Sequence, residues 1–383
     1  MNPTALLLGT RVTLWLGPAL AVPAPAPVVE ALSSIQVTQS SDGRDGFQLR
    51  FTLGRPLQLV PDYPLLANPL LRPFGRVVVQ VWNGVVPDTL IDGFITEHHI
   101  DPGTEPGTAT LTITGEDVRV MMDLTAVSMA YPNMPPNVQV QLILARYALY
   151  LGAPAVVIPP LFSDLRLVTD PSQVQNGTDL AYVEQLASEA GYVFFVEPTP
   201  APMVNLAYFG PENRLSVPQP ALSVNMGPET NVERLDFRYN ALGPEVVLGA
   251  VQMPDTVALV PVVTFTSTRP PLAPVPALVA QLPHVRSRLP ERASEDPATA
   301  YGRAQAGTDR AADAITATGE IDTDRYGASL RPRRLVGLRG AGLLFDGFYY
   351  VKSVTHDIRR GQYKQSFTLT REGFGPISPV VPT

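Results

Sequence analysis

The segment from residue 344 to residue 371 reads LFDGFYYVKSVTHDIRRGQYKQSFTLTR, and it decides the class of fold that we expect. Phe348 to Ile358 is rich in aromatic and β-branched residues, whose side chains fit a pleated surface. Arg359 to Gln362 is polar and contains a glycine, which is typical of a turn. Up to Arg371 the return segment alternates apolar residues such as Phe367 with polar ones. We therefore predict a β-hairpin with one buried face.

The sequence at the entry to this hairpin has a similar counterpart near residue 90, which we call the echo. The stretch LIDGFI at 90–95 resembles LFDGFY at 344–349, and both precede a strand, a glycine-containing turn and a threonine-alternating strand. The echo predicts that segments 77–115 and 335–371 form the same hairpin, although a shared turn preference would also produce it. We expect the strand residues Thr110, Thr112, Thr368 and Thr370 to face solvent. Gly347, at the hairpin entry, is expected in a left-handed or bulged conformation.

Residues 1–125 are predicted to form a first β domain, a barrel or a sandwich. The strands that we expect are Val12–Leu16, Ile35–Gln39, Phe47–Leu53, Val77–Trp82, Phe94–Ile100 and Thr108–Thr114. A signal peptide is the alternative for the apolar N-terminus. However, a basic n-region is lacking, and Gly9 and Arg11 interrupt the apolar run. The run is also too short and broken to span a membrane.

Residues 126–227 are predicted to form a small mixed α/β segment with two helices. The first helix covers Val138–Leu151 and is closed by Gly152. Its apolar stripe contains Val138, Leu142, Ala145 and Leu149 and, on the same broad stripe, Ile143 and Ala148. Ser163–Asp170 is a short mixed stretch. Thr178 is expected to cap the second helix, whose stripe contains Leu180, Val183 and Leu186 and which ends at Gly191. Tyr192–Val196 then forms a strand.

Residues 228–373 are predicted to form a second β domain, followed by a proline-rich tail at 374–383. Its expected strands are Leu235–Tyr239, Glu245–Val251, Val257–Thr266, Arg334–Leu338 and the hairpin. A proline-rich loop or arm covers 269–297, and a helix covers Ala298–Thr318 and ends at Gly319. The fold class that follows is mainly β (α+β), with two similar β-barrel domains and an intervening small mixed α/β segment.

Composition limits the function classes. Charged residues make up only 16% of the chain, so partners cover much of the surface or the surface is an uncharged, threonine- and proline-rich one. The net charge of −7 argues against a protein that neutralises many phosphates. Only two of the 28 basic residues are lysines, which reflects either bidentate arginine contacts or a GC-rich genome. No cysteine is present, which excludes disulfides and thiolate chemistry.

No local pattern marks an active site. His98 and His99 are neighbours in a predicted strand, so they point to opposite faces and do not share a metal. His356 has no nucleophile at motif spacing, and we interpret it as structural. Gly340 and Gly342 lack the lysine and hydroxyl of a phosphate loop. The carboxylates, which carry no acid/base pattern, are Glu116, Asp117, Asp309, Asp313, Glu320, Asp322 and Asp324.

Two groups of short motifs carry a resemblance to a known family. The first comprises Asp346–Val351, Val354–His356, Gly361–Tyr363 and Phe367–Arg371; the second comprises Thr178–Val183, Leu186–Ala187 and Gly191–Phe195. In this order and spacing, and with weaker agreement in the first 125 residues, the chain resembles the phage late control protein D family. Those proteins are baseplate hubs of contractile tails, and they are similar to the hub portion of VgrG spikes.

The resemblance implies a structural hub with two barrels of tail-tube type. It implies a homotrimer that joins a sixfold tail tube to a threefold spike, so that three chains present six similar barrels around a polar channel. The implied partners are the tail tube protein, a spike protein and other baseplate proteins. No nucleic-acid specificity, membrane anchor or cofactor is implied, and no catalytic or metal-binding residue.

The implied location is a virion or phage-tail-like particle, assembled in the bacterial cytoplasm. Because the chain ends soon after Arg371, in Phe374–Thr383, we expect the spike to be a separate protein. A tail-associated or secreted hydrolase of carbohydrate, such as peptidoglycan, is the alternative function. A monomeric β-rich binding module is a third.

Overall fold

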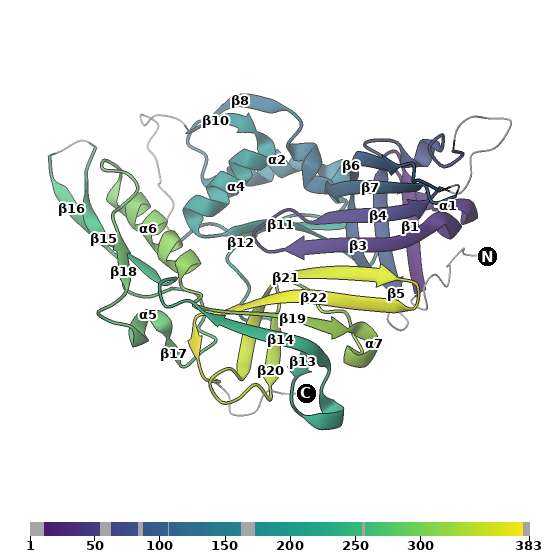
Figure 1. Ribbon diagram of the computed structural model, residues 1–383. Coiled ribbons are helices and arrows are strands. Elements are labelled where there is room, and N and C mark those ends of the chain that lie inside the picture. The colour runs from purple at the N-terminus through teal and green to yellow at the C-terminus, as the bar shows by residue number, and fades with distance from the viewer. Residues whose placement is uncertain are drawn as a thin grey trace.

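The computed structural model describes residues 11–53, 63–82, 87–105, 107–161, 173–254 and 257–377. The prediction for Ser163–Asp170 lies outside these residues, as do residues 1–10. One sheet of thirteen strands runs through the molecule (Figure 1). Its main path has the order β14-β19-β22-β21-β3-β4-β7-β6-β5-β1-β2, and β20 and β13 branch from β21. The predicted mainly β fold is therefore confirmed.

The first unit is the part of this sheet built from the N-terminal strands. Its elements are β1 (Arg11–Gly17), β2 (Val22–Pro23), α1 (Ala26–Ala31), β3 (Leu32–Ser40), β4 (Gly46–Thr52), β5 (Arg76–Trp82), β6 (Pro87–Asp101) and β7 (Thr110–Asp117). Alternate residues of β1 and of β3 to β7, such as Leu14, Val37, Leu49 and Ile113, are buried in one cluster. The sheet thus curls around its own apolar core, as the alternation predicts.

The second unit is built from strands of the C-terminal half. Its strands are β13 (Gln219–Ser223), β14 (Val232–Tyr239), β19 (Ile315–Asp322), β20 (Leu335–Arg339), β21 (Gly347–Arg359) and β22 (Gln362–Arg371), with α7 (Thr323–Tyr326) and β23 (Gly373–Phe374) beside them. Residues of all six strands, such as Leu222, Ile321 and Phe367, line its core. Because β13 pairs with β20, this unit begins before residue 228, the boundary expected from the sequence.

The mixed segment between the units contains the strands β8 (Ala126–Tyr131), β9 (Val156–Val157), β10 (Gln173–Thr178), β11 (Val193–Pro198) and β12 (Asn205–Gly210), and the helices α2 (Pro136–Ala145), α3 (Ala148–Leu151) and α4 (Asp179–Ala190). The hydroxyl of Thr178 accepts a bond from the Ala181 amide, and Gly191 ends α4 with a φ of 70°. The predicted cap and stop of this helix are therefore confirmed.

The prediction of one helix over Val138–Leu151 is wrong. The chain leaves the helix at Arg146 and Tyr147, and α3 is a separate turn. Of the predicted stripe, Ile143 is buried, but Val138, Leu142 and Leu149 are exposed. Val140 and Leu144, which the predicted stripe did not include, are buried instead. Nearly every residue of this stretch is apolar or aromatic, so periodicity alone does not identify the buried face.

A compact insert, residues 240–314, separates β14 from β19. It contains β15 (Glu245–Gln252), β16 (Leu259–Val263), β17 (Val275–Pro276), α5 (Ala277–Ala280), β18 (Arg286–Arg288) and α6 (Pro297–Ala311). Figure 1 shows α6 lying over β15, away from the main sheet, and Val247 and Val251 pack against Ala300 and Ala304. The sequence expectation placed 245–251 in the second barrel and extended the helix to Thr318. In the structure the helix ends at Ala311, and the alanine-rich run continues as β19.

The two units repeat each other strand by strand, apart from the sixth strand. Rows of paired residues across the sheet match: Ile35–Leu49–Ile113–His98 in the first unit and Leu235–Gly319–Phe367–Val354 in the second. Both units have a bulge after the first residue of the edge strand and another in the long strand, between Ile95 and Glu97 or between Val351 and Ser353. The sixth strand differs, because β1 is antiparallel to β5 whereas β13 is parallel to β20.

The match extends to one irregular residue before β5 and before β20. Phe74 and Arg333 both have left-handed backbones, with φ of 59° and 63°. Their amides donate to the carbonyls of Ile95 and Val351, which are themselves equivalent. A non-glycine residue in this conformation is uncommon. Its recurrence at the same place indicates one structural unit used twice.

The residues that suggested the repeat do not superpose as aligned in the sequence. Gly93 pairs with Asp117, whereas Tyr349 occupies the matching position in the second unit and Gly347 matches Ile91. The threonine strands are displaced likewise, since Thr114 matches Thr368 rather than Thr370. Strand side chains alternate with a period of two, so a shift of two residues preserves the pattern and the sequence does not reveal it.

The two units are joined edge to edge along what we call the seam, the pairing of β3 with β21. It extends from Ser40 opposite Ser353 to Ser34 opposite Arg359. Before the bulge, β21 pairs with β20 of its own unit; after the bulge, it pairs with β3 of the other. Ile358 and Tyr363 of the second unit thereby enter the core of the first.

We predict that Gly347→Val destabilises the protein by more than about 1 kcal/mol. Gly347 has a φ of 130°, and a Cβ there would lie 2.7 Å from Nη1 of Arg371 and 3.1 Å from Cα of Pro376. The measurement is the free energy of unfolding in denaturant. Gly46→Val is the control, because Gly46 lies in β4 and a Cβ would meet its nearest atom at 3.4 Å. Equal effects of the two changes would contradict the prediction.

We predict that Leu186→Ala costs about 2–5 kcal/mol, the range for a buried leucine. Leu186 lies on the buried side of α4, as does Val183. Both belong to the core of the mixed segment, together with Phe194 of β11. Leu149→Ala is the matched control, since Leu149 is 71% exposed. Its effect on the unfolding free energy should be close to zero, and a loss as large as that of Leu186→Ala would refute the assignment.

Candidate assembly interface

The acidic residues singled out in the sequence lie apart and are engaged in structural contacts. Asp117 bonds Arg119 at 2.6 Å, and Asp313 bonds Arg214 at 2.8 Å. Asp309 accepts bonds from the amide and hydroxyl of Thr268, at 2.8 and 2.6 Å. Glu116 pairs with Arg44, Glu320 pairs with Lys364, and Asp322 caps α7. Within the described ranges, no group of three or more His, Asp and Glu residues is arranged to hold a metal ion.

His98 and His99 lie where β6 extends beyond β5, opposite Ile113 and Thr112 of β7. His99 is exposed, whereas Nε2 of His98 is buried and has no hydrogen-bond partner among the described residues. Neighbouring strand residues project to opposite faces, as the sequence predicts. The two rings therefore do not form a shared site.

His356 is fully buried at the seam and hydrogen-bonded. Gln365 donates to its Nδ1 at 3.1 Å, which leaves Nε2 to carry the proton and to donate to Oε1 of Gln39, also at 3.1 Å. The Tyr363 hydroxyl lies 2.8 Å from Nδ1. Burial, and then the charge of Arg331, lower the pKa of His356 to about 3. The imidazole is therefore neutral, and it links β3, β21 and β22.

Buried arginines tie the units to each other and to the mixed segment. Arg76 of β5 bonds both oxygens of Asp92 at 2.7 Å and also the carbonyl of Tyr150 in α3. Arg333, just before β20, bonds Asp45 at 2.6 Å across the seam. Asp45 lies in the turn between β3 and β4. A bidentate pair such as Arg76 with Asp92 is geometrically specific. Part of the arginine content therefore serves internal junctions.

A third buried arginine joins three parts of the chain. Arg214, just before the second unit, bonds Glu212, Asp313 at the end of the insert, and Glu372 after β22. Its side chain is 1% exposed. The insert is thus anchored to the main sheet by charges that water does not screen.

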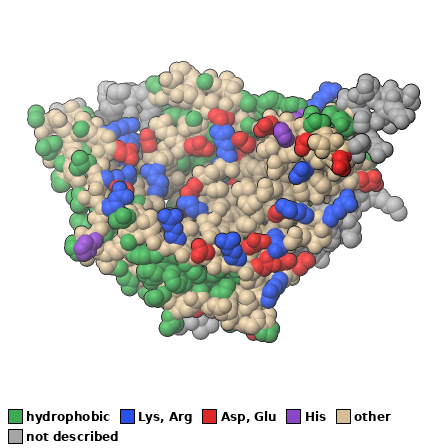
Figure 2. Space-filling model, viewed as in Figure 1, with side chains coloured by type: hydrophobic (Ala, Val, Ile, Leu, Met, Phe, Trp, Pro, Cys, Tyr) green, Lys and Arg blue, Asp and Glu red, His purple; other side chains and the backbone are tan. Residues whose placement is uncertain are grey.

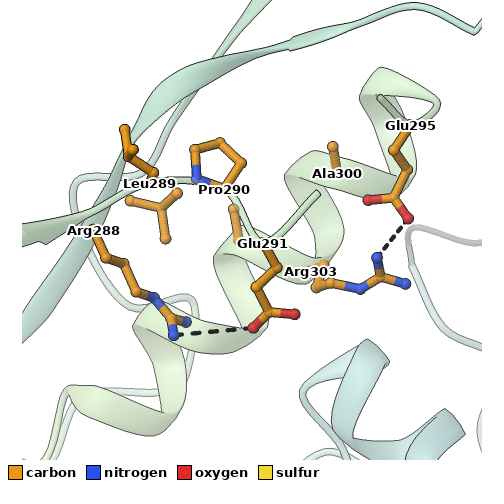
Figure 3. Close-up of a pocket in the computed structure, with 9 residues that line it drawn as sticks. Arg288, Leu289, Pro290, Glu291, Glu295, Ala300 and Arg303 are labelled. Carbon is orange, nitrogen blue, oxygen red and sulfur yellow. Dashed lines mark hydrogen bonds and ion pairs between the residues drawn. The ribbon is translucent and has the colours of Figure 1, made fainter. Parts of the chain in front are cut away.

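The hollows of the described surface differ in size. The pocket in Figure 3, between α6 and the stretch after β18, has a volume of about 10 Å³, roughly that of one water molecule. Two ion pairs lie in it, Arg288–Glu291 and Arg303–Glu295. A wider cleft of about 450 Å³ lies between the first unit, α4 and the insert. Part of its charged lining is paired, with Arg44 bonded to Asp123 and Lys352 to Asp42.

The solvent face of the main sheet is polar near the seam, where uncharged side chains lie among charged ones such as Arg50, Asp357 and Lys364. Its uncharged residues there are Gln36, Thr38, Gln48, Thr112, Thr114, Thr355, Ser366 and Thr368. The hydroxyls of Thr38 and Thr355 meet across the seam at 3.2 Å. Figure 2 shows an uncharged area over part of this sheet, with basic and acidic side chains beside it. Thr370 does not share the predicted exposure; it is buried where the chain enters β19 from α6.

Within the repeated five-strand units, two strand edges lie without a partner strand among the described residues. One is the extension of β6, Glu97–Asp101, which pairs with β7 only. The other is the outer edge of β14, which pairs with β19 on its opposite side. Unpaired edges present free backbone donors and acceptors, and natural proteins rarely leave long ones unprotected. These two edges are the candidate assembly interface.

No protein-family model and no curated protein matches this sequence. Among the helices of the described residues, none has the length and apolar character needed to cross a membrane.

Solved structures do match. A tail protein from Neisseria meningitidis MC58 has a TM-score of 0.61 at 14% identity, over 95% of this chain and 97% of that one. The 43 kDa tail protein of prophage MuSo2 from Shewanella oneidensis has a TM-score of 0.62 at 13% identity, over 95% and 98%. An E. coli component of the type VI secretion system has a TM-score of 0.56 at 14% identity, over 92% and 77%. The chain therefore has the fold of these tail and secretion-system proteins.

We predict that stability falls as the pH decreases from 6.5, because of His356. Its ordinary pKa of 6.5 applies in the unfolded chain, and the folded value is about 3. The unfolded state thus takes up the proton first, and stability present above pH 6.5 is lost towards pH 3. The single group contributes a loss of about 1–2 kcal/mol between pH 6.5 and about pH 5.

The measurement is the unfolding free energy as a function of pH. His356→Gln should lower stability at neutral pH and flatten the dependence above about pH 5, where most carboxylates remain ionised. The exposed His99→Gln should keep the dependence. A His356→Gln protein with the original slope would show that other groups are responsible.

Proposed function

We propose that this chain is a structural baseplate hub of a contractile phage tail or of a phage-tail-like injection system. In the proposed assembly three copies form a ring that adapts a sixfold tail tube to a threefold spike. The fold shared with two tail proteins, one of them from a prophage, and with a type VI secretion component supports this proposal. The observation that carries it is the repeat of one five-strand unit, in register, within a single chain.

The repeat answers a problem of symmetry. A ring of three identical subunits presents one copy of each surface per subunit, so it matches a sixfold partner only if each subunit contains two equivalent surfaces. The two units are already side by side in one sheet, joined by the seam. Three chains then present six similar units to the tube.

The sheet order supports a closed ring. Eight consecutive strands, β14-β19-β22-β21-β3-β4-β7-β6, extend from one free edge to the other. Three copies joined at those edges would close a barrel of twenty-four strands, and closure removes exposed edges. The threonine-, serine- and glutamine-rich face would line its channel. The same face also carries charged side chains of both signs, among them Arg50, Asp357 and Lys364.

A hub also fits the chemistry of the described residues. Several carboxylates and His356 are used in internal contacts, and part of the charged lining of the larger cleft is paired. In the proposal the partners are other copies of the chain, the tube protein, a spike protein and further baseplate proteins. The chain would act within a virion or a tail-like particle.

We expect the purified chain to form a trimer, either alone or when mixed with its cognate tube protein. Sedimentation or light scattering measures the mass, and electron microscopy should show a ring with six similar lobes. A monomer under both conditions, at every concentration up to the solubility limit, would refute the hub.

A parallel assay on peptidoglycan tests the hydrolase alternative. We expect no release of soluble fragments above that of buffer. Turnover that is lost on substitution of a surface carboxylate would instead support an enzyme.

A further inference from the structure

We infer that the β6 extension (Glu97–Asp101) of one copy pairs, antiparallel, with the free edge of β14 in the next copy. The inference rests on the proposed ring of copies, and it specifies which residues meet. It follows from the internal repeat, because the seam already shows how the equivalent pieces join.

The seam supplies the template. There the part of β21 after its bulge pairs with the outer edge of β3. The β6 extension is the equivalent of that part of β21, and β14 is the equivalent of β3. Each unit therefore has one strand extension and one receiving edge. Within one chain only one extension and one edge are joined. The complementary extension and edge lie at the two ends of the eight-strand path from β14 to β6.

The transferred register brings apolar residues together on the core side. His356 faces Val37 in the seam, so Ile100 would face Phe237; Val354 faces Gln39, so His98 would face Tyr239. Ile100 is 44% exposed and Tyr239 is 38% exposed, which is unusual for such side chains on the core side of a sheet. Leu235 and Phe237 are only partly buried at the open end of the second core. A docked extension would complete that core, as Ile358 completes the first.

The polar side of the same register is complementary in charge. Thr355 faces Thr38 in the seam, so His99 would face Arg238. The side-chain neighbours of Arg238 along the extension would be Glu97 and Asp101, two residues to either side of His99. Arg238 is exposed and forms no ion pair among the residues that the structure describes. Asp101 would lie opposite Asp236, with Arg234 and Arg238 on its diagonals.

The absence of cysteine from the chain makes a disulfide test clean. The probe is the double variant His99→Cys/Arg238→Cys, oxidised mildly in the assembled protein. Because the equivalent hydroxyls at the seam are 3.2 Å apart, the two thiols should form a disulfide. The expected product is a covalent trimer on a non-reducing gel that returns to single chains on reduction.

Two controls accompany the probe. Thr38→Cys/Thr355→Cys carries the same geometry within one chain, so it should oxidise without any increase in mass. In His99→Cys/Arg234→Cys the second cysteine lies four residues along β14 from the position expected opposite residue 99. This variant should therefore cross-link much less. Comparison of His99→Cys/Arg238→Cys with His99→Cys/Arg234→Cys thus tests the register of the contact as well as the two edges that form it.

The outcomes separate the inference from the proposed function. A trimer that cross-links through His99→Cys/Arg238→Cys supports both. A trimer that does not, while the seam control oxidises, overturns the inference and leaves the hub intact. A protein that stays monomeric overturns both. Cross-linking into an open ladder beyond three chains supports the contact but overturns the closed ring of three.

A non-covalent variant provides a second readout. Arg238→Glu would bring a third carboxylate between Glu97 and Asp101, and we expect at least a tenfold increase in the concentration needed for trimer formation. Arg359→Glu, in the exposed and equivalent region of the seam, is the control and should leave the trimer intact. Unchanged assembly of Arg238→Glu, in a variant whose circular dichroism shows that it is folded, would overturn the inferred register.

Discussion

The pairing of β21 with β3 is the constraint on which the remaining architecture depends. It forces one strand to serve two units, first with β20 and then, after a bulge, with β3. The bulge is what allows this change of partner, because it redirects the strand and leaves the alternation of side chains intact on both sides. With this pairing in place, the two units share one sheet, and Ile358 contributes to a core that belongs mainly to the other unit.

Buried polar groups then fix the relative position of the parts. The Asp45–Arg333 pair and the His356–Gln39 bond cross the seam, whereas Arg76, Arg119 and Arg214 connect the sheet to the mixed segment and the insert. Burying an ion pair contributes little net stability, but losing one partner of such a pair typically costs about 3–5 kcal/mol. These contacts therefore specify one arrangement of the units more than they strengthen it, which suits a part that must fit rigid neighbours.

Equivalent positions of the two repeated units lie in different environments. At the equivalent edge positions the first unit has Ile35 and Val37, fully buried under β21, and the second has Leu235 and Phe237, half covered. In the first unit the connection from the edge strand to the next is a short turn, whereas in the second the insert occupies the same place. Insertions at a turn preserve the pairing on either side of it, so the second unit keeps its register despite the added domain.

The sequence by itself determined most of the strands, the cap and stop of α4, the hairpin at 347–371 and the existence of a repeat, because these depend on local pattern and turn chemistry. It did not determine the true superposition of the repeat, because a two-residue shift conserves alternation. Nor did it identify the buried face of α2 or the end of α6, where a run of apolar or alanine residues suits either state. The seam, the shared strand and the two complementary free edges were decided only by the tertiary structure. The order of strands in the sheet depends on contacts between residues that are hundreds of positions apart in the sequence. The bulges and the shared cores determine that order.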